Sequence, residues 1–226
     1  MLFHFHLFDK KWSYLHTLSL QSCLARANPD KLVVHYDISG HGEAWDAAHL
    51  LAVEWRQVEA PDALDDYILD VLYAEGGFFS ALDVVFLKNF EPLRHNEAVI
   101  GIQCAQKKKL SYAVVGSRAG SEYIKACRNH AKPLTEPLWD TVGYPVTVMP
   151  RMTFYPLARS NKAFWDGTAL KLKRSFAIRL WESQHPEISE EVLLKSGLGA
   201  ELRAILKKPP TTLGTITQTS GFLTFD

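Results

Sequence analysis

One segment constrains the fold more than any other: a helix, a glycine pair and an apolar strand follow one another between residues 63 and 88. Gly76 and Gly77 end the helix, because glycine adopts a positive φ that other residues resist. The sequence FFSALDVVFLK that follows favours a buried strand. The apolar residues of the helix recur at the spacing of one buried face: Leu64, Tyr67, Ile68, Val71 and Leu72.

Strand and helix patterns alternate along the first half of the chain. Strands are predicted at 2–8, 32–37 and 54–58, and helices at 13–27 and 43–52. Such alternation is typical of a parallel sheet covered by helices. We therefore expect an α/β fold, Rossmann-like, with a mainly parallel central sheet and helices on both faces.

The second half has fewer regular patterns. Pro209 and Pro210 end its last predicted helix, since proline lacks the backbone donor that a helix needs. The lysine run Lys107–Lys109 is expected to be a solvated loop. The predicted elements are strands at 98–103 and 112–116 and helices at 120–130 and 189–207.

The first predicted strand carries two histidines. Phe3, Phe5 and Leu7 fall on one face of it, and His4 and His6 fall on the other. A histidine pair in this place either lines a site or simply occupies polar strand positions. The pattern leaves both interpretations open.

Composition narrows the class of partner. The 226 residues suit one domain, and 25 Lys and Arg balance 25 Asp and Glu, so we expect a small molecule or a protein as partner and no nucleic acid. The three cysteines are odd in number and have no metal-ligand spacing. Without an apolar run of the length that a bilayer requires, we expect a cytoplasmic protein, with at most peripheral membrane contact.

Three segments carry a resemblance to a known family. LYAEGGFFSALDVVFLKNF at 72–90 resembles the segment LY..GG.Y.D.D...LKPL of the DXD glycosyltransferases, among them yeast α-1,6-mannosyltransferases, lactosylceramide α-1,4-galactosyltransferase and clostridial glucosylating toxins. TFYP at 153–156 and SFAIRLWES at 175–183 resemble later elements of the same families. The matching residues of the first segment are Leu72, Tyr73, Gly76, Gly77, Asp83, Leu87 and Lys88.

The resemblance implies a fold and an activity. The fold is the GT-A-like fold of nucleotide-diphospho-sugar transferases, with a nucleotide-sugar-binding half at 1–90 and an acceptor side and C-terminal helix at 91–226. The activity is transfer of a hexose from a UDP- or GDP-sugar to a glycan or other acceptor, with Mn²⁺ or Mg²⁺ and with retention of the anomeric configuration. No catalytic base or nucleophile can be named from the sequence.

The two acids of the family motif fall at Ala81 and Asp83, so only the second is present. Acids at i and i+2 of a strand point to one face and can reach one metal-bound diphosphate. The resemblance makes Asp83 the direct metal ligand. Ala81 occupies the position that contacts the donor but cannot accept a hydrogen bond, so we expect lowered activity. An alanine introduced at this position in the laboratory, in place of the acid of the motif, would give the same sequence as a natural loss of that acid.

The resemblance assigns further donor contacts to Asp65, Gly77, Arg179 and Trp181. Asp65 has a second interpretation, an acid in the first turn of a helix capped by Asp62. Arg179 stands where the family has a histidine. It either supplies positive charge to the diphosphate or is an ordinary exposed arginine of a strand.

Departures from the family pattern leave a second function open. Ile68 stands where the families have arginine, and Ala81 and Arg179 depart as well. A catalytically silent relative that binds a sugar nucleotide, a glycan or a protein partner in the same cleft would carry the same substitutions.

Overall fold

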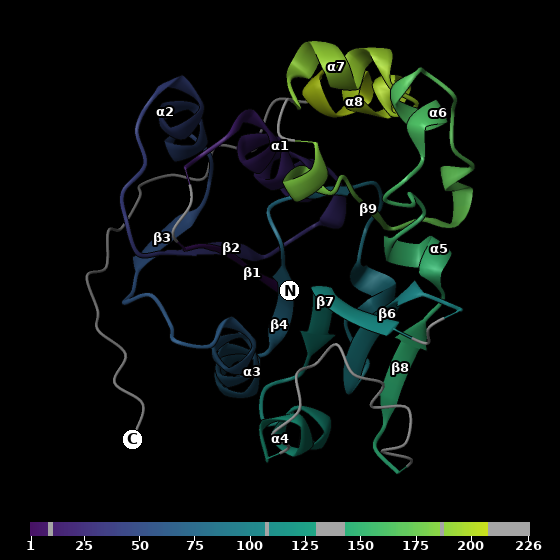
Figure 1. Cartoon of the computed structure of the whole chain (residues 1–226). Helices are drawn as coiled ribbons and strands as arrows, with labels where there is room; N and C mark the ends of the chain where they lie inside the picture. Colours follow the sequence, from purple (N-terminus) through teal and green to yellow (C-terminus); the bar gives the residue numbers. More distant parts are fainter. Residues whose placement is uncertain (9–10, 107–108, 130–142, 186–187, 208–226) are drawn as a thin grey trace.

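A seven-stranded, mostly parallel sheet forms the centre of the molecule in the computed structural model (Figure 1). The structure describes residues 1–8, 11–106, 109–129, 143–185 and 188–207. The strand order is β3-β2-β1-β4-β7-β6-β8. The strands are β1 (Leu2–Leu7), β2 (Lys31–Tyr36), β3 (Glu54–Gln57), β4 (Gly77–Ser80), β6 (Ala98–Cys104), β7 (Lys109–Ser117) and β8 (Val146–Met149).

The first four strands run parallel. β1 lies between β2 and β4, with Phe3 opposite Leu32 on one side and Phe78 on the other. A helix connects each of these strands to the next one in the sequence, because parallel strands need a crossover connection. β7 reverses direction against both β4 and β6, and β8 is parallel to β6. The predicted α/β fold with a mainly parallel sheet is confirmed.

Helices cover both faces of the sheet. In Figure 1, α1, α2, α7 and α8 lie above it and α3 and α4 below. The adjacent side chains of β4 show the same division, because Phe78 packs into the core on one face and Phe79 into the core on the other. The helices are α1 (Tyr14–Ser22, continued by a π-helical turn over Cys23–Ala27), α2 (Glu43–His49), α3 (Leu64–Glu75), α4 (Glu122–Asn129), α5 (Arg151–Phe154), α6 (Lys162–Trp165), α7 (Glu190–Lys195) and α8 (Gly199–Leu206).

A second, two-stranded sheet corrects the long strand predicted after the glycine pair. That strand stops at Ser80, Ala81–Asp83 form a turn, and the chain resumes as β5 (Val84–Phe86). β5 pairs with β9 (Ala177–Arg179), and Val84 lies opposite Arg179. The backbone of β5 thus pairs with β9, while its Phe86 side chain packs against Phe3 and Phe5 of the large sheet.

Two of the predicted helices also differ from the structure. Ala63 caps α3 in place of Asp62 and makes no side-chain bond to the helix. The helix predicted at 189–207 is two helices, which meet at Ser196. Its predicted stop at Pro209 and Pro210 lies outside the described residues, as does the end of the helix predicted at 120–130. None of the helices in the described ranges has both the length and the apolar character of a bilayer crossing.

The two histidines of β1 have different surroundings. His4 is fully buried: its Nδ1 lies 3.0 Å from Nε2 of His35, and its Nε2 lies 3.1 Å from the carbonyl oxygen of Gly76. Tyr67 continues the chain of contacts, with its hydroxyl 2.7 Å from Nδ1 of His35. Burial lowers the pKa of His4 to about 4 and that of His35 well below its ordinary value. Both side chains are therefore neutral at physiological pH.

This histidine pair predicts acid-sensitive stability. Between pH 6.5 and about 4 the unfolded chain binds protons at positions 4 and 35 that the folded chain does not, so the free energy of unfolding falls as the pH falls. Each histidine contributes up to about 1.4 kcal/mol per pH unit. Thermal unfolding followed from pH 7.5 to 4.5 should show a smaller acid-induced loss in His4→Gln than in the parent. His41→Gln, at an exposed position, is the control, and identical pH profiles for His4→Gln and the parent would contradict the argument.

Candidate functional site

A cavity of about 290 Å³ opens at the carboxyl ends of β1 and β4. His6 and Leu7 reach it from the end of β1, and Ala81–Asp83 reach it from the turn that follows β4. Ligands of open α/β sheets bind outside the carboxyl ends of the strands, so the position is that of a ligand site. We call this cavity the central cleft; its charged and polar lining includes His6, His16, Asp83, Lys109, Tyr112, Arg159, Arg179 and Glu182.

An ion pair between Asp83 and Arg179 lies in this cleft. Nε of Arg179 donates to both carboxylate oxygens, at 3.0 Å and 2.9 Å. The backbone fixes the pairing, because Val84 is opposite Arg179 in the small sheet and the amide of Leu180 donates to the carbonyl oxygen of Asp83 at 2.8 Å. The side chain of Asp83 is 8% exposed and that of Arg179 is 24% exposed. The acid of the motif thus has a guanidinium as its partner.

The ring of Trp181 lies against the guanidinium of Arg179. Its ring is buried, and its indole N–H donates to the carbonyl oxygen of Leu157 at 3.1 Å. The guanidinium carbons of Arg179 and Arg159 lie 4.7 Å and 4.6 Å from the ring centre. The backbone of Trp181 has a φ of 58°, which strains a bulky residue. Such strain persists where packing and hydrogen bonds hold a residue in place, commonly at functional sites.

Asp65 reaches the edge of the cleft through Tyr112. The Tyr112 hydroxyl hydrogen-bonds to the half-buried Asp65 carboxylate, and the Tyr112 ring lines the cleft. Burial raises the pKa of Asp65 above its ordinary value, although the bond from Tyr112 opposes that shift. Burial and the nearby Asp65 carboxylate raise the pKa of Tyr112 to about 12, so the hydroxyl stays protonated and donates. Asp65 itself is not among the residues that line the cleft.

Gly77 lies away from the central cleft. It begins β4, whereas the cleft is at the other end of that strand. Its φ is 97°, and a Cβ added to it would lie 2.5 Å from the carbonyl oxygen of Leu2. The close approach of β1 requires glycine there, and Gly77 is not among the residues that line the central cleft. Ile68 is fully buried in the core beneath α3, as its place in the apolar stripe predicted.

No protein-family model matches the chain, and no curated protein matches it. Among solved structures, the apo structure of the bifunctional glycosyltransferase WbbM is similar, with a TM-score of 0.54 and 11% identity over 92% of this chain and 50% of WbbM. The chain has a GT-A-like fold.

Two other glycosyltransferase structures are similar at lower scores. GlyE of Streptococcus pneumoniae TIGR4 has a TM-score of 0.45 and 10% identity over 67% of this chain and 45% of GlyE. The galactosyltransferase LgtC, in complex with donor and acceptor sugar analogues, has a TM-score of 0.42 and 15% identity over 69% of this chain and 75% of LgtC. The chain thus spans about half the length of WbbM and of GlyE.

The carboxylates of the GT-A-like fold's cleft do not form a set that suits a divalent cation. Asp83 has both oxygens on Arg179, and position 81 offers only a methyl group. Glu182, the other carboxylate of the lining, accepts from Ser13 at 2.8 Å and pairs with His16 at 3.0 Å. In the described ranges, no three His, Cys, Asp or Glu side chains are grouped so that they could hold a metal ion. At a nucleotide diphosphate, such a cation is held by one or two carboxylates together with the phosphates, and both carboxylates of this cleft are already engaged by protein groups.

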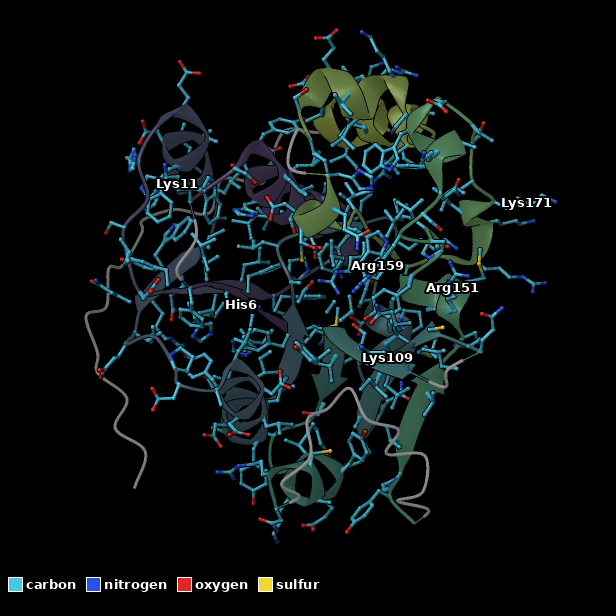
Figure 2. The ribbon with its side chains drawn as sticks, in the orientation of Figure 1. His6, Lys11, Lys109, Arg151, Arg159 and Lys171 are labelled. Atoms are coloured by element: carbon cyan, nitrogen blue, oxygen red, sulfur yellow. The ribbon has the colours of Figure 1, made fainter. Side chains whose placement is uncertain are left out.

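Several residues of the cleft were not predicted from the sequence. Lys109, expected in a solvated loop, is the first residue of β7 and lines the cleft, while Lys107 and Lys108 lie outside the described residues. Arg159 enters from the segment between α5 and α6 (Figure 2). His6, for which the sequence left a site role open, also lines the cleft; its ring stacks on Phe8 and lies at a tilt against Phe79. No local motif marks these residues, because distant segments of the chain bring them together.

The Asp83–Arg179 pair predicts a measurable coupling energy. Removing one partner of a buried pair costs about 3–5 kcal/mol, and the partial exposure of Arg179 reduces this to about 1–3 kcal/mol. Asp83→Asn, Arg179→Gln and the double variant form a double-mutant cycle in urea unfolding. The exposed pair Lys195–Glu191 is the control and should show no measurable coupling. If the two cycles gave the same result, the pair would not hold the cleft together.

Proposed function

We propose that this chain is a glycosyltransferase that binds a UDP- or GDP-sugar in the central cleft and transfers its hexose to a glycan or other acceptor. One observation carries the proposal: a cleft with both arginine and carboxylate side chains lies at the carboxyl ends of β1 and β4 in a GT-A-like fold, and Asp83 of the family motif is in it. An anionic donor needs cations that face its diphosphate, and Lys109, Arg159 and Arg179 supply them.

The chemistry requires two bonds to change. The bond from the anomeric carbon to the diphosphate oxygen breaks, and its electron pair leaves with the diphosphate. The acceptor's hydroxyl oxygen bonds to the same carbon, and its proton passes to the leaving diphosphate. Cationic side chains lower the barrier by stabilising the charge that develops on the leaving group. Retention of configuration, which the family resemblance implies, is part of the proposal.

Both halves of the chain contribute residues to the proposed donor site. Residues 1–90 supply Asp65, Ala81 and Asp83 on the donor side. Residues 91–226 supply the acceptor side and also Arg159 and Arg179, so the donor cleft is formed by both halves. Tyr112 and Asp65 sit at the rim as hydrogen-bonding groups for the donor's ribose or sugar.

A second function has support from the same site. Ala81 lacks an acceptor, Ile68 is in the core where the families have arginine, and Asp83 is engaged by Arg179. A silent relative that only binds a nucleotide, a glycan or a protein partner would keep the cleft and lose turnover. Turnover therefore distinguishes the two functions.

The test is a panel of UDP- and GDP-linked hexoses with the full chain. Isothermal titration calorimetry measures binding with Mn²⁺ and with EDTA, and product analysis measures transfer and donor hydrolysis. The proposed function predicts binding of at least one donor and slow turnover of it, with product of retained configuration. Binding of a donor without any turnover across the panel supports the silent relative. If no donor binds and none is turned over, the result contradicts a donor site.

Position 81 gives a sharper prediction about metal dependence. Ala81→Asp adds a second carboxylate beside Asp83 and should create Mn²⁺ binding and raise Mn²⁺-dependent turnover, by up to about a hundredfold. Asp83→Ala in the same background should remove that gain. Ala163→Asp, which adds a carboxylate at an exposed position of α6, is the matched control. A folded Ala81→Asp variant that gains neither Mn²⁺ binding nor turnover would show that position 81 is not part of a metal site.

A further inference from the structure

The two carboxylates of the central cleft are already engaged by protein groups. Asp83 holds Nε of Arg179, and Glu182 holds Ser13 and His16. A divalent cation would have to displace Arg179 and would then find one carboxylate and the methyl group of Ala81. Asp83, which the family resemblance makes the metal ligand, instead orients the guanidinium of Arg179 in this chain.

Arg179 keeps most of its donors for a ligand. A guanidinium has five N–H donors, and only the one on Nε is used by Asp83. In the part of the chain that the structure describes, the terminal nitrogens of Arg179 make no hydrogen bond, and the side chain lines the cleft. Asp83 and the Trp181 ring together hold the guanidinium in a fixed plane, so little conformational entropy is lost when an anion binds.

Arg159 provides a second guanidinium on the same ring. It is exposed, it lines the cleft, and within the described residues it forms no ion pair. The two guanidinium carbons lie 4.6 Å and 4.7 Å from the centre of one indole ring, and both side chains line the cleft, so both are available to a diphosphate that binds there. Lys109 adds a third cation to the lining (Figure 2). The lining thus has three cations against two carboxylates that already have partners.

We propose that Arg179 and Arg159 take the place of a divalent cation, so that the chain binds the diphosphate of its donor without metal. The inference rests on the proposed function for the nature of the ligand. Paired guanidinium–phosphate hydrogen bonds are charge-assisted and directional, and they neutralise the leaving group without a metal ligand set. In this arrangement Asp83 is a positioning residue that acts on the diphosphate through Arg179.

Calorimetry of the full chain tests the inference. The probes are UDP, GDP and inorganic pyrophosphate, each titrated in EDTA and in Mn²⁺, with uridine and guanosine as phosphate-free controls. The expected result is that a diphosphate binds in EDTA with the same Kd as in Mn²⁺. Pyrophosphate separates recognition of the phosphates from recognition of the base.

Substitution of each arginine identifies the groups responsible. Arg159→Gln and Arg179→Gln should each weaken diphosphate binding about tenfold to a hundredfold and leave nucleoside binding unchanged. Lys171→Gln is the matched control, since Lys171 is exposed and points outward at the edge of the molecule (Figure 2). Arg179→Gln leaves Asp83 without its partner, so thermal unfolding is recorded as well. Arg159→Gln removes no ion pair within the described ranges, so its effect on binding does not depend on the unfolding measurement.

The outcomes separate this inference from the proposed function. Diphosphate binding that appears with Mn²⁺ and disappears in EDTA overturns the inference and leaves the proposed function standing. Binding in EDTA that neither arginine variant weakens also overturns it. If no probe and no sugar nucleotide binds under either condition, both the inference and the proposed function fail.

Discussion

The contact between Asp83 and Arg179 determines how the rest of this site is arranged. It joins a turn at the end of the parallel strands to β9, a short strand from the other half of the chain. Because the pair is largely buried, removing either side chain leaves the charge of the other without its partner. The turn, the small sheet and the strained backbone of Trp181 all lie within two residues of one member of the pair.

The features that follow from local physics could be predicted from the sequence. The apolar stripe of α3 and the positive φ of Gly76, which ends that helix, depend on neighbouring residues, and the structure has them where they were expected. The family motif also led to the cleft, since Ala81 and Asp83 both line it. They reach it from a turn and not from a continuous strand, because the chain changes sheets at that point.

The features that depend on tertiary packing could not be predicted. Gly77 belongs to the motif, yet the close approach of β1 explains it and places it at the far end of β4. Arg159 and Lys109 carry no motif, and only the fold brings them to the same cavity as Asp83. Arg179 was expected as a donor contact and lines the cleft, but a single sequence does not show that it pairs with Asp83, the carboxylate expected to hold a metal.

The sequence distance across the Asp83–Arg179 pair has a consequence for how the site comes into being. The two residues are 96 positions apart, whereas the parallel strands β1, β2, β3 and β4 are complete by Ser80. During synthesis, the first strands of the sheet therefore emerge long before the residue that completes the cleft. Contacts of such high separation form late, after the entropy of closing a long loop has been lost. Asp83 has no Arg179 to pair with through that interval, and the cleft is complete only when β9 docks beside β5.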